Sequence, residues 1–184
     1  DRVIAGPERK SRVISPREKE IIAYHEAGHA LVAHLLPNAD PVYKITIVSR
    51  GMTGGFTRLL PEEDRHLGTR SQFQDMLAAT LAGHVAEELV LGEMTTGPQN
   101  DIEQATKIAR QMVTQWGMSE RLGFVCYGDE VANRRLPWDL GLNREFSDQT
   151  SEIIDQEVKR IIDAAFADTR RLIEENREQL EAVA

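Results

Sequence analysis

The sequence contains a single cysteine, Cys126, among its 184 residues. One thiol cannot form a disulfide within the chain, and this usage is compatible with a reducing compartment. The neighbouring residues Phe124, Val125 and Tyr127 favour an interpretation of Cys126 as a small apolar residue. No apolar run approaches the roughly eighteen residues that a membrane-spanning helix needs. The start, Asp1-Arg2-Val3, resembles neither a signal nor a transit peptide.

Basic residues are also in deficit. Lys and Arg total 22 against 30 Asp and Glu, which gives a formal net charge of −8. No basic cluster is dense enough to outweigh this excess, so neither a nucleic acid nor an anionic membrane surface is an expected partner. The phosphate-binding pattern G-x-x-x-x-G-K-[ST] is absent too, so the glycines predict no nucleotide-binding loop.

The most informative stretch that is present is His25-Glu26-Ala27-Gly28-His29. An α-helix turns about 100° per residue, so histidines four residues apart lie one above the other and can bind the same metal ion. Glu26 then lies beside the ion, where it can take a proton from a water molecule. This H-E-x-x-H pattern is typical of zinc hydrolases. It predicts His25 and His29 as metal ligands and Glu26 as the catalytic base.

The residues around the motif predict the helix that carries it. Ser15 is suited to cap a helix, Pro16 to open it and Glu18 to complete a capping box. Apolar residues then recur at helical spacing as far as Leu36. The alternative is a pair of core histidines that hydrogen-bond to backbone carbonyls, but burying two separate imidazoles one turn apart is costly.

Periodicity elsewhere predicts a mainly α chain with a small β-sheet, an α+β fold that ends in a C-terminal helical bundle. Thr69 with Gln72, or Ser71, is expected to cap the second helix. The last helix, or helix pair, carries an apolar stripe and is expected to pack on its own domain. The predicted strands are 41–48, 56–60 and 124–127, and the predicted helices are 15–36, 69–91, 99–116 and 147–184.

A catalytic zinc ion normally has three protein ligands, so one more must come from elsewhere in the chain. The extended motif H-E-x-x-H-x-x-G-x-x-H is excluded, because Val32 and Leu35 occupy its glycine and last histidine positions. A nearby downstream glutamate is not available, since no acidic residue lies between Asp40 and Glu62. The choice stays open, because the first turn of a helix favours Asp101 for its charge alone. The remaining candidates are His66, His84, Glu87, Glu88 and Asp101.

Five stretches of the chain together form a combination of motifs that is specific to one protein family. They are Gly6-Pro7-Glu8-Arg9-Lys10-Ser11, Ala23-Tyr24-His25-Glu26-Ala27-Gly28-His29-Ala30, Ala86-Glu87-Glu88-Leu89, Thr95-Thr96-Gly97-Pro98-Gln99-Asn100-Asp101-Ile102 with Ala105-Thr106, and Met112-Val113-Thr114-Gln115-Trp116-Gly117-Met118-Ser119. Together they resemble the M41-type peptidase domain of the FtsH family of membrane-anchored, ATP-dependent zinc metalloproteases. The resemblance covers nearly the whole chain and is weak between Phe124 and Phe146. One departure is His84, where the family usually has arginine.

The resemblance implies a zincin-like helix and a site with one zinc ion per chain. His25, His29 and Asp101, the last in an Asn-Asp-Ile motif, map onto the family's zinc ligands, and Glu26 maps onto its catalytic glutamate. The implied activity is that of a zinc endopeptidase that hydrolyses unfolded or misfolded proteins, membrane proteins included, as part of quality control.

The resemblance also implies a longer parent protein. In the family, a membrane segment and an AAA ATPase module precede the peptidase, and the whole assembles as a homo-hexamer with this domain on the cytoplasmic, matrix or stromal side. Residues 1–14 would then be a connector from the ATPase module and residues 15–184 the peptidase domain. Within it, a catalytic core is expected at about 15–117 and C-terminal helices at about 147–184. This chain itself is expected to be soluble and to bind no ATP.

Two further expectations concern binding. Gly54, Gly55 and Phe56 are expected to present a strand edge with which an extended substrate can pair. The alternative to a peptidase is a helical interaction or oligomerisation module with a structural or vacant metal site. The long amphipathic stripe at the C-terminus suggests that alternative.

Overall fold

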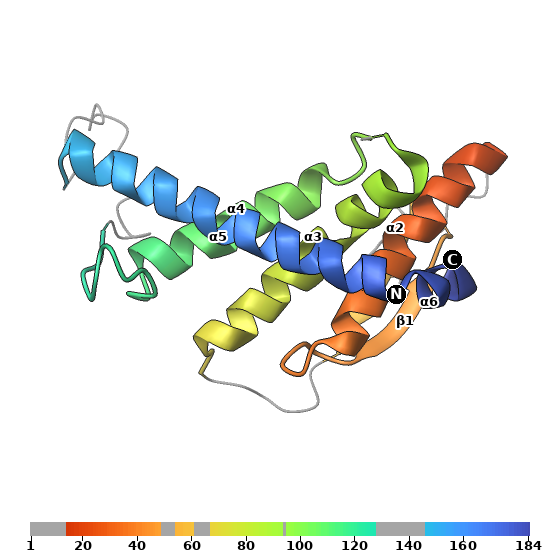
Figure 1. Ribbon diagram of the computed structural model, residues 1–184, viewed down its shortest axis with the longest axis horizontal. Helices are drawn as coiled ribbons and strands as arrows, with labels where there is room; N and C mark the ends of the chain where they lie inside the picture. The colour runs from red at the N-terminus through yellow and green to blue at the C-terminus, as the bar shows by residue number, and fades with distance from the viewer. Residues whose placement is uncertain (1–13, 49–53, 61–66, 94, 128–145) are drawn as a thin grey trace, which may run out of the picture.

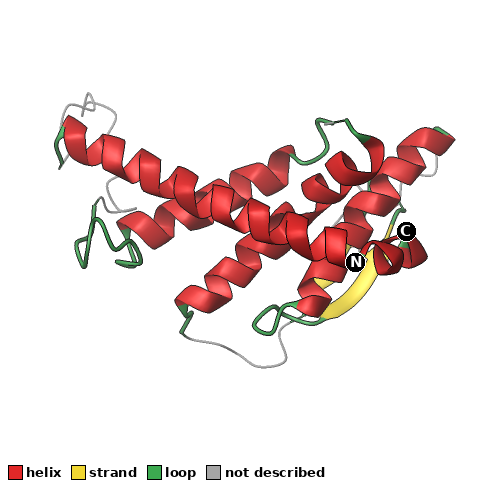
Figure 2. Ribbon diagram, viewed as in Figure 1, coloured by secondary structure: helices red, strands yellow, loops and turns green. Residues whose placement is uncertain are grey.

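The computed structural model describes residues 14–48, 54–60, 67–93, 95–127 and 146–184 (Figure 1). They form helices and a two-stranded sheet (Figure 2), which confirms the predicted mainly α class with a small β-sheet. Apart from Ile14, the expected connector lies outside the described residues, as does His66. The elements are α2 (Pro16–Leu35), β1 (Val42–Thr46), β2 (Phe56–Leu59), α3 (Arg70–Leu91), α4 (Gln99–Thr114), α5 (Asp148–Glu175) and α6 (Arg177–Val183).

The first helices begin at the capping residues that the sequence predicts. The hydroxyl of Ser15 accepts a hydrogen bond from the N–H of Glu18 at 3.1 Å and caps α2. Thr69 caps α3 in a full capping box: its hydroxyl accepts from the N–H of Gln72, and the Gln72 side chain accepts from the N–H of Thr69. At the other end, Gly92 adopts a left-handed conformation with φ 66°, which glycine tolerates without strain.

Helix α3 is the central element of the fold. It packs against α2 on one side and against α4 and α5 on another, and α5 runs across it in Figure 1. One cluster of buried residues joins α3, α4 and α5, and a second joins α2, α3 and the end of the chain. The first contains Leu77, Leu81, Ala105, Ile108, Ala109, Met112, Val113, Leu122, Ile154, Val158, Ile161 and Ala165. The second contains Ala27, Leu31, Val32, Ala78, Ala82, Val85, Ala86, Ile173 and Leu180.

Helices α2 and α3 approach each other most closely at Gly28. A methyl group at this position would lie 2.6 Å from the carbonyl oxygen of Ala82 and 2.7 Å from the Cβ of Ala86. Both distances are shorter than non-bonded atoms allow, so only glycine fits between the two histidines of the motif. This contact holds the motif-bearing face of α2 directly against the backbone of α3.

The sheet is small and depends on α2. Strands β1 and β2 pair antiparallel, with Ile45 opposite Thr57 and Thr46 opposite Phe56. An isolated two-stranded sheet is marginal in water, so packing against a helix is needed for its stability. Both strands contact α2, which places the start of β2 beside the motif.

The C-terminal helices pack within the chain, as predicted. The first half of α5 buries Ile154, Val158 and Ile161 against α3 and α4. Its last turns and α6 bury Ile173 and Leu180 in the cluster with α2. The apolar stripe is therefore used inside the domain.

The predicted strand at 124–127 is wrong. These residues form no strand, and Phe124 is 99% exposed. The segment is held by other bonds, since the N–H of Tyr127 donates to the carbonyl of Thr114 at 2.8 Å. Cys126 is exposed and is not packed as a small apolar residue. The residues favour a strand by type, but no described strand lies beside them to pair with.

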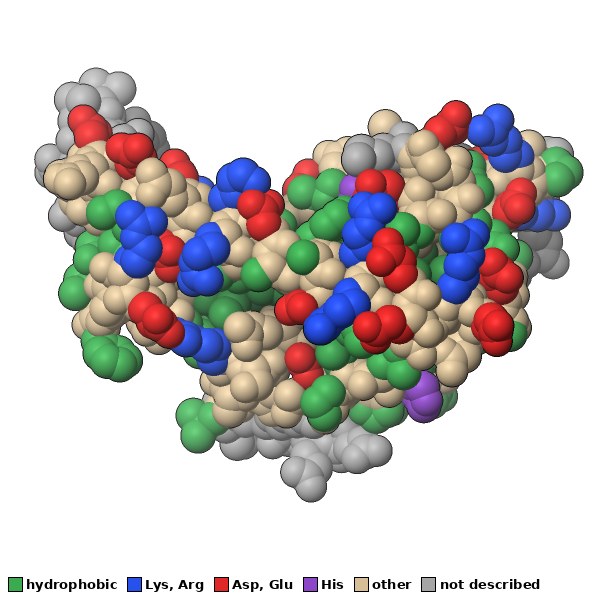
Figure 3. Space-filling model, in the orientation of Figure 1, with side chains coloured by type: hydrophobic (Ala, Val, Ile, Leu, Met, Phe, Trp, Pro, Cys, Tyr) green, Lys and Arg blue, Asp and Glu red, His purple; other side chains and the backbone are tan. Residues whose placement is uncertain are grey.

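One face of the molecule is charged without strong segregation. Acidic and basic side chains are interspersed on the face that α5 crosses (Figure 3). None of the described helices is both long enough and apolar enough to span a bilayer.

Replacing Gly28 by alanine should lower the free energy of unfolding by about 1–3 kcal/mol, the usual cost of overpacking a tight contact. The added methyl group would have to push α2 away from Ala82 and Ala86. Urea denaturation measures the effect, with Lys19→Ala on an exposed position of α2 as a control that stays within about 0.5 kcal/mol of wild type. A Gly28→Ala protein as stable as wild type would show that the helices are not in such close contact.

Candidate metal centre

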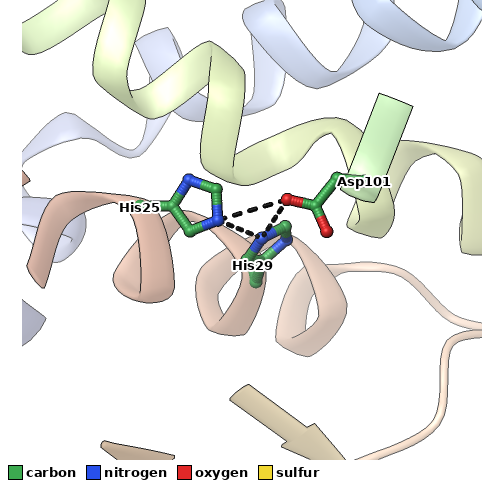
Figure 4. A group of neighbouring side chains, drawn as sticks. All are labelled: His25, His29 and Asp101. Carbon is green, nitrogen blue, oxygen red and sulfur yellow. Dashed lines mark hydrogen bonds and ion pairs between the residues drawn. The ribbon is translucent and has the colours of Figure 1, made fainter. Parts of the chain in front are cut away.

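Three side chains from two helices meet at one place (Figure 4). His25 and His29 extend from α2, and Asp101 extends from the first turn of α4. The two Nε2 atoms are 3.0 Å apart, and Oδ2 of Asp101 lies 3.2 Å from the first and 3.4 Å from the second. The three atoms form a nearly equilateral triangle. Each side chain is mostly buried, with 14% of each histidine and 20% of the aspartate exposed.

The other nitrogen of each ring decides which tautomer is present. Nδ1 of His25 lies 2.8 Å from a carboxylate oxygen of Glu87, and Nδ1 of His29 lies 2.7 Å from the carbonyl oxygen of Ala79. Both partners only accept hydrogen bonds, so each Nδ1 carries the hydrogen and donates it. In the neutral rings, each Nε2 is then a bare acceptor. Two lone pairs and a carboxylate oxygen therefore converge on one point.

Such a cluster of acceptors requires a cation. At 3.0–3.4 Å the three atoms repel one another unless a proton or a metal ion lies among them. Zinc binds histidine nitrogen and carboxylate oxygen at about 2.0–2.2 Å, which places tetrahedral ligand atoms about 3.3 Å apart. The observed separations match that spacing. The donor set and its geometry thus fit a zinc ion with a further position left for water or substrate.

The electrostatics of His25 and Asp101 also favour a bound cation. Burial by itself lowers the pKa of His25, but hydrogen bonds to Asp101 and Glu87 outweigh it and raise the pKa to about 9. Burial by itself raises the pKa of Asp101, yet the contacts with His25 and His29 hold that pKa well below its usual range. The site therefore stabilises an ionised carboxylate and attracts positive charge.

Glu87 links the parts of the site. Its side chain is almost fully buried; one oxygen accepts from His25 and the other accepts from the hydroxyl of Thr95 at 2.7 Å. Thr95 in turn accepts from the N–H of Gly97, in the turn that leads into α4. A single buried carboxylate on α3 therefore orients a ring on α2 and anchors the segment that precedes Asp101. Outer partners of this kind hold metal-binding histidines in position.

Gly83 makes room for the two rings on α3. A methyl group there would lie 2.5 Å from Cε1 of His25 and 2.5 Å from Nε2 of His29. Any side chain at this position would occupy the space of the imidazoles. The backbone of α3 thus forms one wall of the site.

Glu26 lies next to the cluster on α2 and is buried, with 6% of the residue exposed. Oε2 accepts a hydrogen bond from the hydroxyl of Thr57 in β2 at 2.7 Å. Burial raises the pKa of Glu26, and the Thr57 bond and the nearby histidines only partly oppose that effect. A carboxylate in such a setting is suited to exchange a proton.

The other candidate ligands point elsewhere. The ring of His84 packs toward Phe166 of α5, with ring centroids 6.0 Å apart. Glu88 pairs with Arg170 of α5 at 3.2 Å. Glu87 contacts the far nitrogen of His25 and lies outside the triangle. Of the candidates in the described residues, only Asp101 reaches both Nε2 atoms.

Comparison with known proteins gives the family. Residues 12–184 match Peptidase family M41. The chain belongs to this family. It is 54% identical to the ATP-dependent zinc metalloprotease FtsH 1 of Sphaerobacter thermophilus and 55% identical to that of Thermomicrobium roseum, in both cases over 184 residues that cover 100% of this chain and 28% of the relative. The protein of the same name from Thermoanaerobacter sp. is 51% identical over 183 residues, which cover 100% of this chain and 30% of the relative.

The chain therefore spans less than a third of the length of these M41 relatives. The sequence predicts Glu87 as one of several candidate ligands and does not predict its position between His25 and Thr95. It predicts a strand at Thr57, a helix at Gly83 and a family motif at Thr95, but no role in the site for any of the three. Sequence spacing carries no signal for these contacts, because each depends on how two elements pack.

Changing Glu87 to Gln or Ala should weaken zinc binding about 10- to 100-fold, the usual loss when an outer partner of a metal-binding histidine is removed. Competition with a chromogenic chelator measures the affinity. Glu88→Gln is the matched control, because the neighbouring carboxylate faces Arg170 and should leave zinc affinity unchanged. Equal affinities for the two variants would mean that Glu87 does not support the site.

Proposed function

We propose that this chain is a zinc-dependent endopeptidase domain, in which His25, His29 and Asp101 hold one zinc ion and Glu26 is the catalytic base. The observation that carries the proposal is the convergence of three acceptor atoms 3.0–3.4 Å apart, with a buried carboxylate beside them. Membership of Peptidase family M41 and the names of the zinc metalloprotease relatives support the reaction class.

Different residues of the chain have different roles in the proposed peptide hydrolysis. A bound zinc ion supplies Lewis acidity toward the peptide carbonyl and the attacking water. Glu26 accepts the proton of that water and then delivers it to the leaving nitrogen; the raised pKa of Glu26 suits both steps. Glu87 and the carbonyl of Ala79 keep the two imidazoles oriented with Nε2 toward the site.

Gly54, Gly55 and Phe56 are the proposed substrate-binding residues. They lead into and begin β2, and a methyl group at Gly55 would lie 3.0 Å from Oε1 of Glu26. Within the described residues β2 pairs with β1 alone, and the proposed substrate pairs as an extended peptide with the second edge of β2. Pairing with a strand edge recognises peptide backbone and suits unfolded protein as a substrate.

The wider setting is also part of the proposal. The relatives are named ATP-dependent, and this chain corresponds to 28–30% of their length. We propose that the peptidase acts in a membrane-anchored homo-hexamer, on the cytoplasmic, matrix or stromal side, where a separate ATPase module delivers misfolded proteins. The present chain by itself would cleave only unfolded proteins and short peptides. The alternative of a helical interaction module is not favoured, because the stripe of α5 is buried within the domain.

Glu26→Gln should retain one zinc ion per chain and lose about 10²- to 10⁴-fold in peptide hydrolysis, because the amide cannot accept the proton. Hydrolysis of a quenched fluorescent peptide and metal analysis of the same samples measure the two quantities. Retained cleavage by a zinc-loaded Glu26→Gln protein would exclude Glu26 as the base.

His25→Ala and Asp101→Ala should each lose both zinc and hydrolysis, since a ligand atom of the triangle is removed. Chelation of the wild-type protein should abolish activity, and added zinc should restore it. Activity that survives complete removal of the metal would contradict the proposed function.

A further inference from the structure

We propose that Thr57 is a positioning residue that holds the carboxylate of Glu26 in one orientation for proton transfer. This inference rests on the proposed role of Glu26 as catalytic base. Thr57 contacts neither the histidines nor Asp101 in any hydrogen bond of the described site, so it would act through Glu26 alone.

The contact between the two side chains is short and joins separate elements. The hydroxyl of Thr57 in β2 lies 2.7 Å from Oε2 of Glu26 and 3.0 Å from the backbone carbonyl of the same residue. A hydroxyl has one hydrogen, and a carboxylate is the stronger acceptor, so the bond to Oε2 takes it. Thr57 is thus a donor aimed at one oxygen of the base.

The second carboxylate oxygen has a different neighbour. A methyl group at Gly55 would lie only 3.0 Å from Oε1 of Glu26, 2.9 Å from Ile22 and 2.7 Å from the carbonyl of Thr46. The backbone of the chain therefore passes close to Oε1 without a side chain that could displace it. With Oε2 tied to Thr57, Oε1 is the oxygen left to accept the proton of the attacking water.

The support behind Thr57 is rigid. Threonine is branched at Cβ and has few side-chain rotamers. Its strand position is fixed by pairing opposite Ile45 in β1. Glu26, in contrast, reaches the site through three rotatable side-chain bonds, so an external donor is needed to hold its carboxylate. A catalytic base that samples several orientations gives a slower reaction even though it is present, since misplacement by about 1 Å can lower the rate about 100-fold.

The decisive variants are Thr57→Val, which keeps the shape and removes the hydroxyl, and Thr57→Ser, which keeps the hydroxyl. Thr46→Val is the matched control, because that hydroxyl accepts from the N–H of Val48 at 3.1 Å elsewhere in the same sheet. Each is prepared as the full 184-residue chain loaded with zinc. Zinc content and melting temperature are measured alongside kcat and KM for a quenched peptide.

Thr57→Val should lower kcat about 10-fold or more with KM within about twofold, because the orientation of Glu26 matters in the transition state and not for binding. Thr57→Ser should stay within about threefold of wild type, and Thr46→Val should match wild type. In a Glu26→Gln background, Thr57→Val should cause no further loss, because the two residues act as one unit. Zinc content should be the same in all variants.

A Thr57→Val protein with wild-type kcat, or a Thr57→Ser protein as slow as Thr57→Val, would overturn the inference. Crystal structures of wild type and Thr57→Val give a readout that does not need activity. The Glu26 carboxylate should have one conformation in wild type and a shifted conformation, or several, in Thr57→Val. If wild type itself does not hydrolyse peptides, the proposed function fails. The crystal structures then still decide the positioning role, and an unmoved carboxylate in Thr57→Val would refute it.

Discussion

The structure depends on one constraint: three hydrogen-bond acceptors are held 3.0–3.4 Å apart in a largely buried place. Lone pairs at such distances are unfavourable without a cation, so the fold must supply enough packing energy to bring them together, and a cation must stabilise the result. Each ring is fixed by a bond on its far side, to Glu87 and to the carbonyl of Ala79. Those bonds direct both Nε2 atoms toward Asp101, and this arrangement favours a metal site over a pair of core histidines.

Helix α3 provides nearly everything that this constraint requires. The contact of Gly28 with Ala82 and Ala86 sets the distance between α2 and α3. Gly83 and Glu87 lie one turn apart on α3. Gly83 leaves the space that the two imidazole rings occupy. Glu87 orients the ring of His25 and also holds the turn before α4 through Thr95. The small residues of α3 are therefore as important to the site as its charged ones. On the other side of α2, the strand β2 contacts Glu26 through Thr57. The proposed metal site and the proposed base are thus supported by different neighbours of one helix.

Sequence reasoning predicted the local features of this arrangement and few of the long-range ones. The spacing of His25 and His29 was sufficient to predict that their rings lie together, because the helical repeat alone places them on one face of the helix. The cap at Thr69, with Ser71 as the alternative, was predictable because a capping box depends on residues only three positions apart. Asp101 could not be chosen from the residues, since its distance to the histidines depends on how α4 is placed, and a family resemblance was needed to favour it. Glu87 and Glu88 are neighbours of identical type, and only packing shows that one faces His25 and the other Arg170. The strand expected at 124–127 failed because strand propensity needs a partner strand.

The central claim is that Asp101 joins the two imidazoles in binding a single zinc ion. An anomalous difference map, measured from zinc-loaded crystals above and below the zinc absorption edge, tests it most directly. The expected result is one peak at about 2.0–2.1 Å from both Nε2 atoms and about 2.0–2.2 Å from an oxygen of Asp101. A peak coordinated by Glu87 in place of Asp101, or no peak between the two rings, would contradict it.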